Sequence, residues 1–209
     1  MNEAKTIGLV VAPGVTEKLA ESLIDDIPNI LSHQNNNQHD WEVDLVVDPL
    51  TGYAESVGKI FKKIQDYHDK RQWDYVVAIT DLPMFHNERV LALDINKKNG
   101  AAVFSYPAFG WRPVKKRFKN AIVAIINEVH HSEAEKNDYD DNDNVTYAVN
   151  KQFPLSKIEK TEVYLDETGN DHLRYSSNTR SMGMVRLVSG MTFANNPLNM
   201  MASLSNIVA

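Results

Sequence analysis

Four short apolar runs, each followed by a polar loop rich in Pro, Gly or Asp, dominate the hydrophobic pattern of the chain. They read IGLVVAPG, EVDLVVDPLTG, YVVAITDLP and AAVFSYPAFG, at residues 7–14, 42–52, 75–83 and 101–110. Their length and their β-branched residues are typical of strands that are buried on both faces of a parallel sheet. Parallel strands end at one edge of an open sheet, where ligands usually bind, so the pattern predicts a binding site at these loops.

Amphipathic helices are predicted between these strands. The first is capped by Thr16, the second spans about residues 55–70, and the third spans about residues 113–131. This alternation of strand and helix predicts a three-layer α/β domain over residues 1–131. Its sheet is expected to be mostly parallel, of a Rossmann-like or flavodoxin-like type.

One segment breaks the alternation of strand and helix. Two extended runs at residues 90–94 and 101–105 flank the pair Asn99-Gly100. An Asn-Gly pair favours a tight hairpin turn. We therefore expect an antiparallel hairpin at the edge of the otherwise parallel sheet.

The net charge of −6 comes mostly from one acidic stretch, SEAEKNDYDDNDN at residues 132–144. Such a stretch is typical of a solvated, flexible linker, predicted here at residues 132–146. Calcium binding is the alternative, but the stretch lacks the Gly and the closing Glu of an EF-hand loop. Residues 147–209 are predicted to form a small irregular tail with two short strands around residues 167–170. The rest of the chain is nearly neutral, which argues against nucleic acid as a partner.

Composition and missing motifs exclude several protein classes. The chain has no Cys, which excludes disulfides, thiolate zinc sites and a cysteine nucleophile, and suits a reducing compartment. The first residues lack the pattern of a signal peptide, and no apolar run reaches the about 18 residues of a membrane-spanning helix. No Gly-x-Ser-x-Gly elbow, P-loop or Gly-x-Gly-x-x-Gly motif occurs, which argues against the common hydrolase, ATP and NAD sites.

Candidate binding residues lie in the loops that follow the predicted strands: Pro13, Gly14, Asp48, Thr51, Thr80, Asp81 and Ser105. Asp48 and Asp81 each directly follow a strand, and a strand order of two-one-three would place the first strand between them. Two carboxylates on one rim could bind a metal, share a proton or accept hydrogen bonds from a sugar. Alternatively, each aspartate caps a turn, since Asp-Pro and Asp-x-Pro are common turn formers.

The third predicted helix begins with a run of cations, Arg112, Lys115, Lys116, Arg117 and Lys119. Positive charge at a helix N-terminus opposes the macrodipole, so a bound phosphate, carboxylate or anionic lipid headgroup would stabilise it. Arg112, Lys115 and Lys116 are therefore candidate anion-binding residues. The alternative is a solvated basic face that is screened by salt.

The seven histidines are scattered along the sequence, and none belongs to a His-Glu-x-x-His motif. The adjacent His130 and His131 point about 100° apart on a helix and cannot easily share an ion. No metal site and no cofactor are therefore expected.

The four strand-end motifs also carry a family resemblance. Taken in order, VVAPG, WEVDLVVDPLTG, WDYVVAITDLPM and AAVFSYPAFG, followed by a basic helix, resemble a family of Gram-positive bacterial proteins of unknown function. The likeness covers most of the chain and extends weakly into RLVSGMTFANNP at residues 186–197. In that family a hydrophobic C-terminal region with predicted transmembrane helices follows the soluble domain. The resemblance thus implies a domain on the cytoplasmic face of the cell membrane, with residues 200–209 as the first turns of a membrane segment.

Two further likenesses bear on activity. Some members of that family carry the label methylenetetrahydrofolate dehydrogenase, but the Tyr-x-x-x-Lys pair and the Gly-Arg-Ser segment of that enzyme are absent here. A fainter resemblance is to archaeal-type metzincin peptidases, whose zinc-binding helix would correspond to residues 120–131. The zinc ligands are missing there, so this resemblance implies a metzincin-like fold without its zinc site.

The leading functional hypothesis is a membrane-anchored domain that binds a small anionic ligand or a partner at the carboxyl edge of its sheet. Two alternatives stay open. One is a small-molecule enzyme that uses Asp48 and Asp81, and the other is a homodimeric scaffold whose dimer face consists of the third helix and the tail. Whether the protein is an enzyme is left undecided by the sequence.

Overall fold

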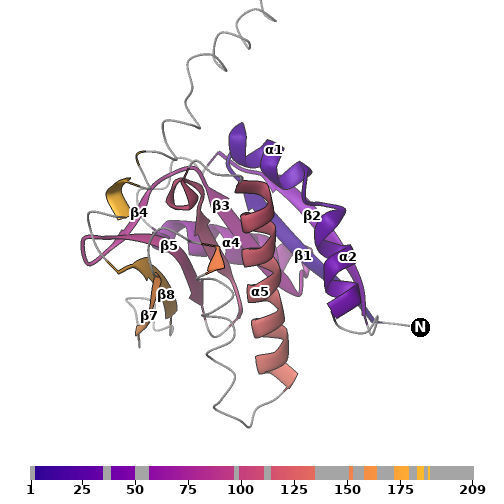
Figure 1. The fold of residues 1–209 in the computed structure, drawn as a ribbon. Coiled ribbons are helices and arrows are strands. Elements are labelled where there is room, and N and C mark those ends of the chain that lie inside the picture. The colour runs from indigo at the N-terminus through magenta and orange to yellow at the C-terminus, as the bar shows by residue number, and fades with distance from the viewer. Residues whose placement is uncertain are drawn as a thin grey trace, which may run out of the picture.

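One open, mixed sheet of eight strands organises the part of the chain that the computed structural model describes (Figure 1). The described residues are 3–34, 39–49, 57–96, 99–110, 114–134, 151–152, 158–163, 172–178, 183–185 and 188. The strands are β1 (Glu3–Val11), β2 (His39–Val47), β3 (Tyr75–Thr80), β4 (Met84–His86), β5 (Arg89–Asn96), β6 (Ala102–Ser105), β7 (Ile158–Val163) and β8 (His172–Ser177). The helices are α1 (Val15–Glu21), α2 (Asp26–Gln34), α4 (Val57–Arg71), α5 (Val114–Ala134) and the short 3₁₀ turn η1 (Tyr106–Phe109).

The sheet has a parallel half and an antiparallel half. Its strand order is β2-β1-β3-β6-β5-β8-β7, with β4 paired to β5 outside this path. Strands β2, β1, β3 and β6 run parallel and are called the parallel half below. Strands β4, β5, β8 and β7 pair antiparallel and are called the antiparallel half. The α/β class is confirmed by this arrangement.

The expectation of a mostly parallel sheet is wrong. Among the described strands, four pairings are antiparallel and three are parallel. The physical reason is that no helix follows β3. The chain turns back through the short strand β4 and a two-residue turn at Asn87 and Glu88, both with positive φ, as a tight hairpin turn requires. A two-residue connection can join only antiparallel strands.

The hairpin around Asn99 is confirmed. Strands β5 and β6 pair antiparallel, with Leu93 opposite Phe104 and Ile95 opposite Ala102. Gly100 has a φ of +65°, a backbone conformation that glycine adopts without steric cost. The hairpin lies inside the sheet rather than at its edge, because β8 pairs with the other side of β5.

The two strands expected around residues 167–170 are also present. They are β7 and β8, and β8 attaches to β5, so both extend the sheet that the first half of the chain begins. Residues 135–150, which include most of the predicted acidic linker, lie outside the described residues, as do residues 189–209. Within the part that is described, no helix is long and apolar enough to cross a membrane.

Helices cover both faces of the sheet, which gives three layers (Figure 1). On one face α1, α2 and α5 bury residues such as Ala20, Ile27 and Phe118 against the strands. On the other face α4 buries Ile60 and Ile64. Each fully buried side chain of this kind contributes about 1.5–3 kcal/mol of transfer free energy, so the two apolar layers are the main stabilising feature.

Gly8 marks the closest approach on the α4 face. A Cβ atom at this position would lie 1.9 Å from Cε3 of Trp73, an impossible contact. The Trp73 ring is almost fully buried, and its Nε1–H donates to Asp44 on β2 at 3.0 Å. The missing side chain at Gly8 therefore lets the indole lie directly on β1.

Candidate functional site

The ends of the parallel strands meet at one edge of the sheet. β1 pairs in parallel with both β2 and β3, and β3 pairs in parallel with β6. The order two-one-three, considered above as a condition, is the order that the structure shows, with β1 in the middle. This edge therefore carries the loops after Val11, Val47, Thr80 and Ser105, as expected for an open parallel sheet.

The loop after β1 is occupied by local hydrogen bonds. The Thr16 hydroxyl donates to the Ala12 carbonyl at 2.5 Å, and the Gly14 N–H donates to the Glu17 carboxylate at 3.0 Å. Gly14 has a φ of +94°, and both Pro13 and Gly14 are exposed. In the structure this loop starts α1.

Asp48 is a buried carboxylate that joins the end of β2 to α4. It is 5% exposed, and it accepts a hydrogen bond from the Tyr67 hydroxyl at 2.8 Å. The Lys63 ammonium lies 3.3 Å from the same oxygen. The hydrogen bond to Asp48 is the main cause that raises the pKa of Tyr67 above its ordinary value.

Asp81 has different surroundings from Asp48. Its side chain is exposed, and partial loss of hydration raises the pKa of Asp81 above its usual range. The two carboxylates thus differ in burial and in partners: Asp48 is held by α4, whereas Asp81 remains on the surface beyond β3.

Thr80 and Ser105 hold the segment that leads to β4. The Leu82 N–H donates to the Thr80 hydroxyl oxygen at 3.1 Å, and the Ser105 hydroxyl donates to the Leu82 carbonyl at 2.9 Å. Both side chains are fully buried. They fix the course of the chain between β3 and β4, and this segment forms one wall of the pocket described below.

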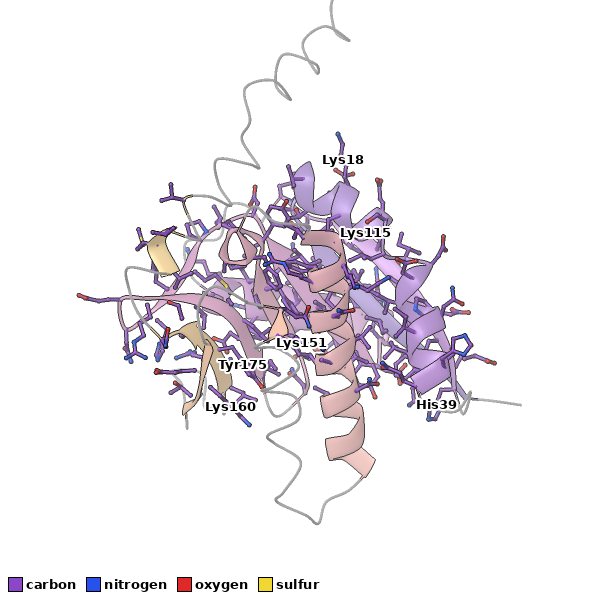
Figure 2. The ribbon with its side chains drawn as sticks, in the orientation of Figure 1. Lys18, His39, Lys115, Lys151, Lys160 and Tyr175 are labelled. Carbon is purple, nitrogen blue, oxygen red and sulfur yellow. The ribbon has the colours of Figure 1, made fainter. Side chains whose placement is uncertain are left out.

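The basic start of α5 is partly neutralised by α2. The Lys119 ammonium lies 3.0 Å and the Lys115 ammonium 3.7 Å from one carboxylate oxygen of Asp26. The Lys119 hydrogen bond lowers the pKa of Asp26. Lys116 is exposed. Figure 2 shows Lys115 on α5, apart from Tyr175 on strand β8. Thr51 and Arg112, the remaining predicted site residues, lie outside the described residues.

A pocket of about 410 Å³ lies beside the carboxyl end of β3. Its apolar wall combines the first turn of α4 with the segment from β3 to β5: Val57, Ile60, Leu82, Pro83, Met84, Phe85 and Leu91. Its polar residues are Thr80, His86, Asp94 and Arg174. Among the residues named in the sequence analysis as site candidates, Thr80 is the one in this described lining.

A connected cluster of charged groups contributes to the pocket from β5 and β8. Asp94 is fully buried, with one oxygen 2.7 Å from His172 Nδ1 and the other 2.8 Å from Arg174 Nε. A carboxylate only accepts hydrogen bonds, so His172 carries its proton on Nδ1. Arg174 Nη1 in turn lies 3.3 Å from Nδ1 of His86, which accepts from the guanidinium.

The roles of the two histidines differ. His172 is 2% exposed, and the Phe61 ring packs edge-on against it at 4.8 Å between centroids. It lies behind Asp94 and supports that carboxylate. His86 lines the pocket, and burial together with the nearby positive charge of Arg174 lowers its pKa below the ordinary histidine value.

Strand register explains how this cluster forms. In β8 the alternate residues His172 and Arg174 point to one face, and they lie opposite Asn96 and Asp94 of β5. A shift in the pairing between Leu91 and Leu93 is typical of a β-bulge, which changes the face that the following residues occupy.

Sequence reasoning missed this cluster because its members are far apart in the chain. Asp94 is separated from His172 by 78 positions and from Arg174 by 80. One signal was available: a single carboxylate inside the apolar run VLALDI needs a buried partner, because an isolated buried charge is very costly.

The described residues contain no group of three or more His, Asp or Glu side chains that could hold a metal ion. Protein-family models, curated proteins and solved structures were all compared with this chain, and none of them matches it. The chemistry of the pocket residues is therefore the evidence on which a function can be proposed.

Proposed function

We propose that this protein is a binding module for a small organic anion, which occupies the pocket at the carboxyl edge of β3. The observation that carries the proposal is the position of Arg174. Arg174 lines the pocket, and its guanidinium is oriented by a fully buried carboxylate, Asp94. An oriented guanidinium in a mostly apolar pocket is a strong recognition element for a carboxylate or a phosphate.

Arg174 retains donors for a ligand. Within the described residues Asp94 uses the N–H of Nε and His86 uses one N–H of Nη1, which leaves the second N–H of Nη1 and both N–H groups of Nη2 for a ligand. The side chain is 19% exposed, whereas Asp94 is 1% exposed. The positive charge is thus closer to solvent than the carboxylate that holds it.

Helix α4 adds a second positive element. Val57 and Ile60, which line the pocket, belong to its first turn, and no acidic residue occupies that turn. The first N–H groups of a helix have no partner within the helix, and they carry about half a positive charge in total. Arg174 and the start of α4 therefore both favour an anion in the same pocket.

The pKa of His86 also indicates that the pocket favours a negatively charged ligand. Arg174 lowers the pKa of His86 more strongly than Asp94 raises it. The potential at the imidazole is therefore more affected by the guanidinium than by the buried carboxylate. The same excess of positive over negative potential would stabilise an anionic group of a ligand.

The position of the pocket also fits a ligand site. The order β2-β1-β3-β6 of the parallel half is like the beginning of a flavodoxin-like sheet. In such sheets ligands bind beyond the carboxyl ends of the strands, and the pocket lies beyond β3. Attachment of this binding module to the cytoplasmic face of a membrane is part of the proposal that rests on the family resemblance alone.

Isothermal titration with three probes tests the proposal. Octanoate, octanol and octylamine share one alkyl chain and differ in charge. We expect octanoate to bind about tenfold more tightly than octanol, because of a charge-assisted hydrogen bond to Arg174, and octylamine to bind most weakly. Equal binding of octanoate and octanol, or no binding of octanoate, would contradict the proposal.

A matched pair of variants locates the site. Leu82→Glu places a negative charge in the half-buried wall of the pocket, and Val47→Glu places the same charge at an exposed position on the same sheet edge. We expect Leu82→Glu to weaken octanoate binding about tenfold or more and Val47→Glu to leave it nearly unchanged. Equal effects of the two variants would place the ligand elsewhere.

A further inference from the structure

We infer that the ligand of this pocket is a monocarboxylate with an apolar body, rather than a phosphorylated or dicarboxylic compound. The inference rests on the proposed function and deepens it. It follows from three features of the described lining: its balance of charge, the number of donors it offers, and the connection of its polar residues into one cluster.

The fixed charges of the lining nearly cancel. Asp94 is negative, Arg174 is positive, and His86 is neutral at physiological pH because its pKa is lowered. The start of α4 adds about half a positive charge. The described lining therefore carries about half a positive charge in total, which compensates part of one negative charge on a ligand, whereas a dianion would retain a larger excess of charge in a poorly solvated site.

The hydrogen-bond donors of Arg174 also favour a monocarboxylate ligand. With Nε and one N–H of Nη1 engaged by Asp94 and His86, three N–H groups of the guanidinium remain for a ligand, one on Nη1 and two on Nη2. The other ring nitrogen of His86, Nε2, already lies 3.2 Å from Asn87 Nδ2. The three donors of one planar guanidinium match the two oxygens of a carboxylate, whereas a phosphate monoester has three strong acceptor oxygens and a charge near −2 above about pH 7.

The apolar wall of the pocket disfavours a ligand that carries a second charged group. Seven of the eleven described lining residues are apolar, and His86, Asp94 and Arg174 form one hydrogen-bonded cluster. A ligand that places one carboxylate at this cluster leaves the rest of its body against aliphatic and aromatic side chains. A second carboxylate on that body would lose hydration without gaining a partner.

Calorimetric titration at about pH 8, where an alkyl phosphate is a dianion, tests the inference. The probes are octanoate, octyl phosphate and the dicarboxylate suberate, with phenylacetate and phenyl phosphate as a second pair. We expect each monocarboxylate to bind about tenfold or more tightly than its phosphate or dicarboxylate counterpart.

The outcomes separate this inference from the proposed function. Equal or tighter binding of the phosphates or of suberate overturns the monocarboxylate inference and leaves anion binding intact. Binding of none of these anions overturns the proposed function and the inference together.

A charge-changing variant checks the physical reason. His86→Lys adds one positive charge to the lining, so the preference for octanoate over octyl phosphate should narrow by roughly threefold. Val47→Lys adds the same charge on the exposed end of β2 and should leave the preference unchanged. An unchanged preference in His86→Lys would show that charge balance does not set the ligand class.

Discussion

Each half of the sheet contains one buried aspartate, and the two have opposite kinds of partners. Asp48, in the parallel half, is bound by Tyr67 and Lys63 from a helix that begins a few residues later in the chain. Asp94, in the antiparallel half, is bound by His172 and Arg174 from a strand about 80 positions away. The first carboxylate attaches a helix to the sheet, and the second orients the cation of a pocket.

The comparison shows that the location of a polar residue in a strand-end loop does not by itself indicate a ligand site. Asp48, Thr80 and Ser105 all lie at the carboxyl edge of the parallel strands, where ligands commonly bind. Their side chains nevertheless hydrogen bond to α4 or to the segment before β4. The residue types that hydrogen bond to the backbone or attach a helix are the same ones that bind ligands. The contacts seen in the structure therefore decide whether such a residue is structural or binds a ligand.

The largest effect is expected from removal of the Asp94 carboxylate. Asp94→Ala leaves the half-buried guanidinium of Arg174 and the buried imidazole of His172 without their acceptor, and breaking a buried ion pair costs about 3–5 kcal/mol. We expect the free energy of unfolding, measured by urea denaturation monitored with circular dichroism, to fall by this amount. Asp81→Ala, at an exposed carboxylate, should change it by less than about 0.5 kcal/mol. Similar losses of unfolding free energy in the two variants would show that the buried Asp94 contributes no more to stability than the exposed Asp81.

A pair of glycine substitutions tests the close packing of the parallel half. Gly8→Ala places a methyl group 1.9 Å from the buried Trp73 ring, so we expect a loss of about 1–3 kcal/mol or more. Gly58→Ala introduces the same methyl group in α4, where no heavy atom lies within 4 Å, and should stabilise the helix by about 0.5–1 kcal/mol. Thermal unfolding of the two variants should therefore shift in opposite directions.

A smaller effect is expected at the aspartate of the parallel half. Tyr67→Phe removes the hydroxyl that donates to Asp48 but leaves Lys63 in place, so we expect a loss of about 1–2 kcal/mol. Asp48→Asn should lower the pKa of Tyr67 towards its ordinary value, because the carboxylate is the main cause of the rise. An alkaline absorbance titration of wild type and variant measures this difference. A Tyr67 titration that is identical in both would mean that the hydrogen bond is absent in solution.

The parallel half could largely be predicted from the sequence. Each of its strands is a short apolar run followed by a turn signal, and this pattern is local because a parallel strand is buried on both faces. The sequence analysis considered the order two-one-three only as a condition, and the structure shows β1 between β2 and β3. The β5–β6 hairpin was signalled by Asn99 and Gly100, since that pair specifies a turn.

The antiparallel half shows why the rest could not be predicted. Strand β4 has three residues, too few for a hydrophobic period, and its turn at Asn87 and Glu88 contains no glycine. The pairing of β5 with β8 joins segments from distant parts of the chain, and local patterns carry no information about such a pairing. The pocket depends on that pairing, because it brings Arg174 to Asp94, so the candidate site was missed together with the topology.

The smallest expected effect is the pH dependence of stability that comes from His86, the histidine that lines the pocket. In the folded protein the pKa of His86 is below its unfolded value of 6.5, so the unfolded chain binds more protons at this residue as pH falls. The contribution of His86 to stability is therefore complete above about pH 6.5 and is lost as pH falls below 6.5 towards the folded pKa.

In His86→Gln this contribution is absent. We expect the difference in unfolding free energy between wild type and His86→Gln to be constant above neutral pH and to shift against wild type as pH falls below 6.5. A constant difference across the whole range for His86→Gln would mean that neither burial nor the positive charge of Arg174 lowers the pKa of His86, and the antiparallel half would then lose the electrostatic feature that distinguishes it from the parallel half.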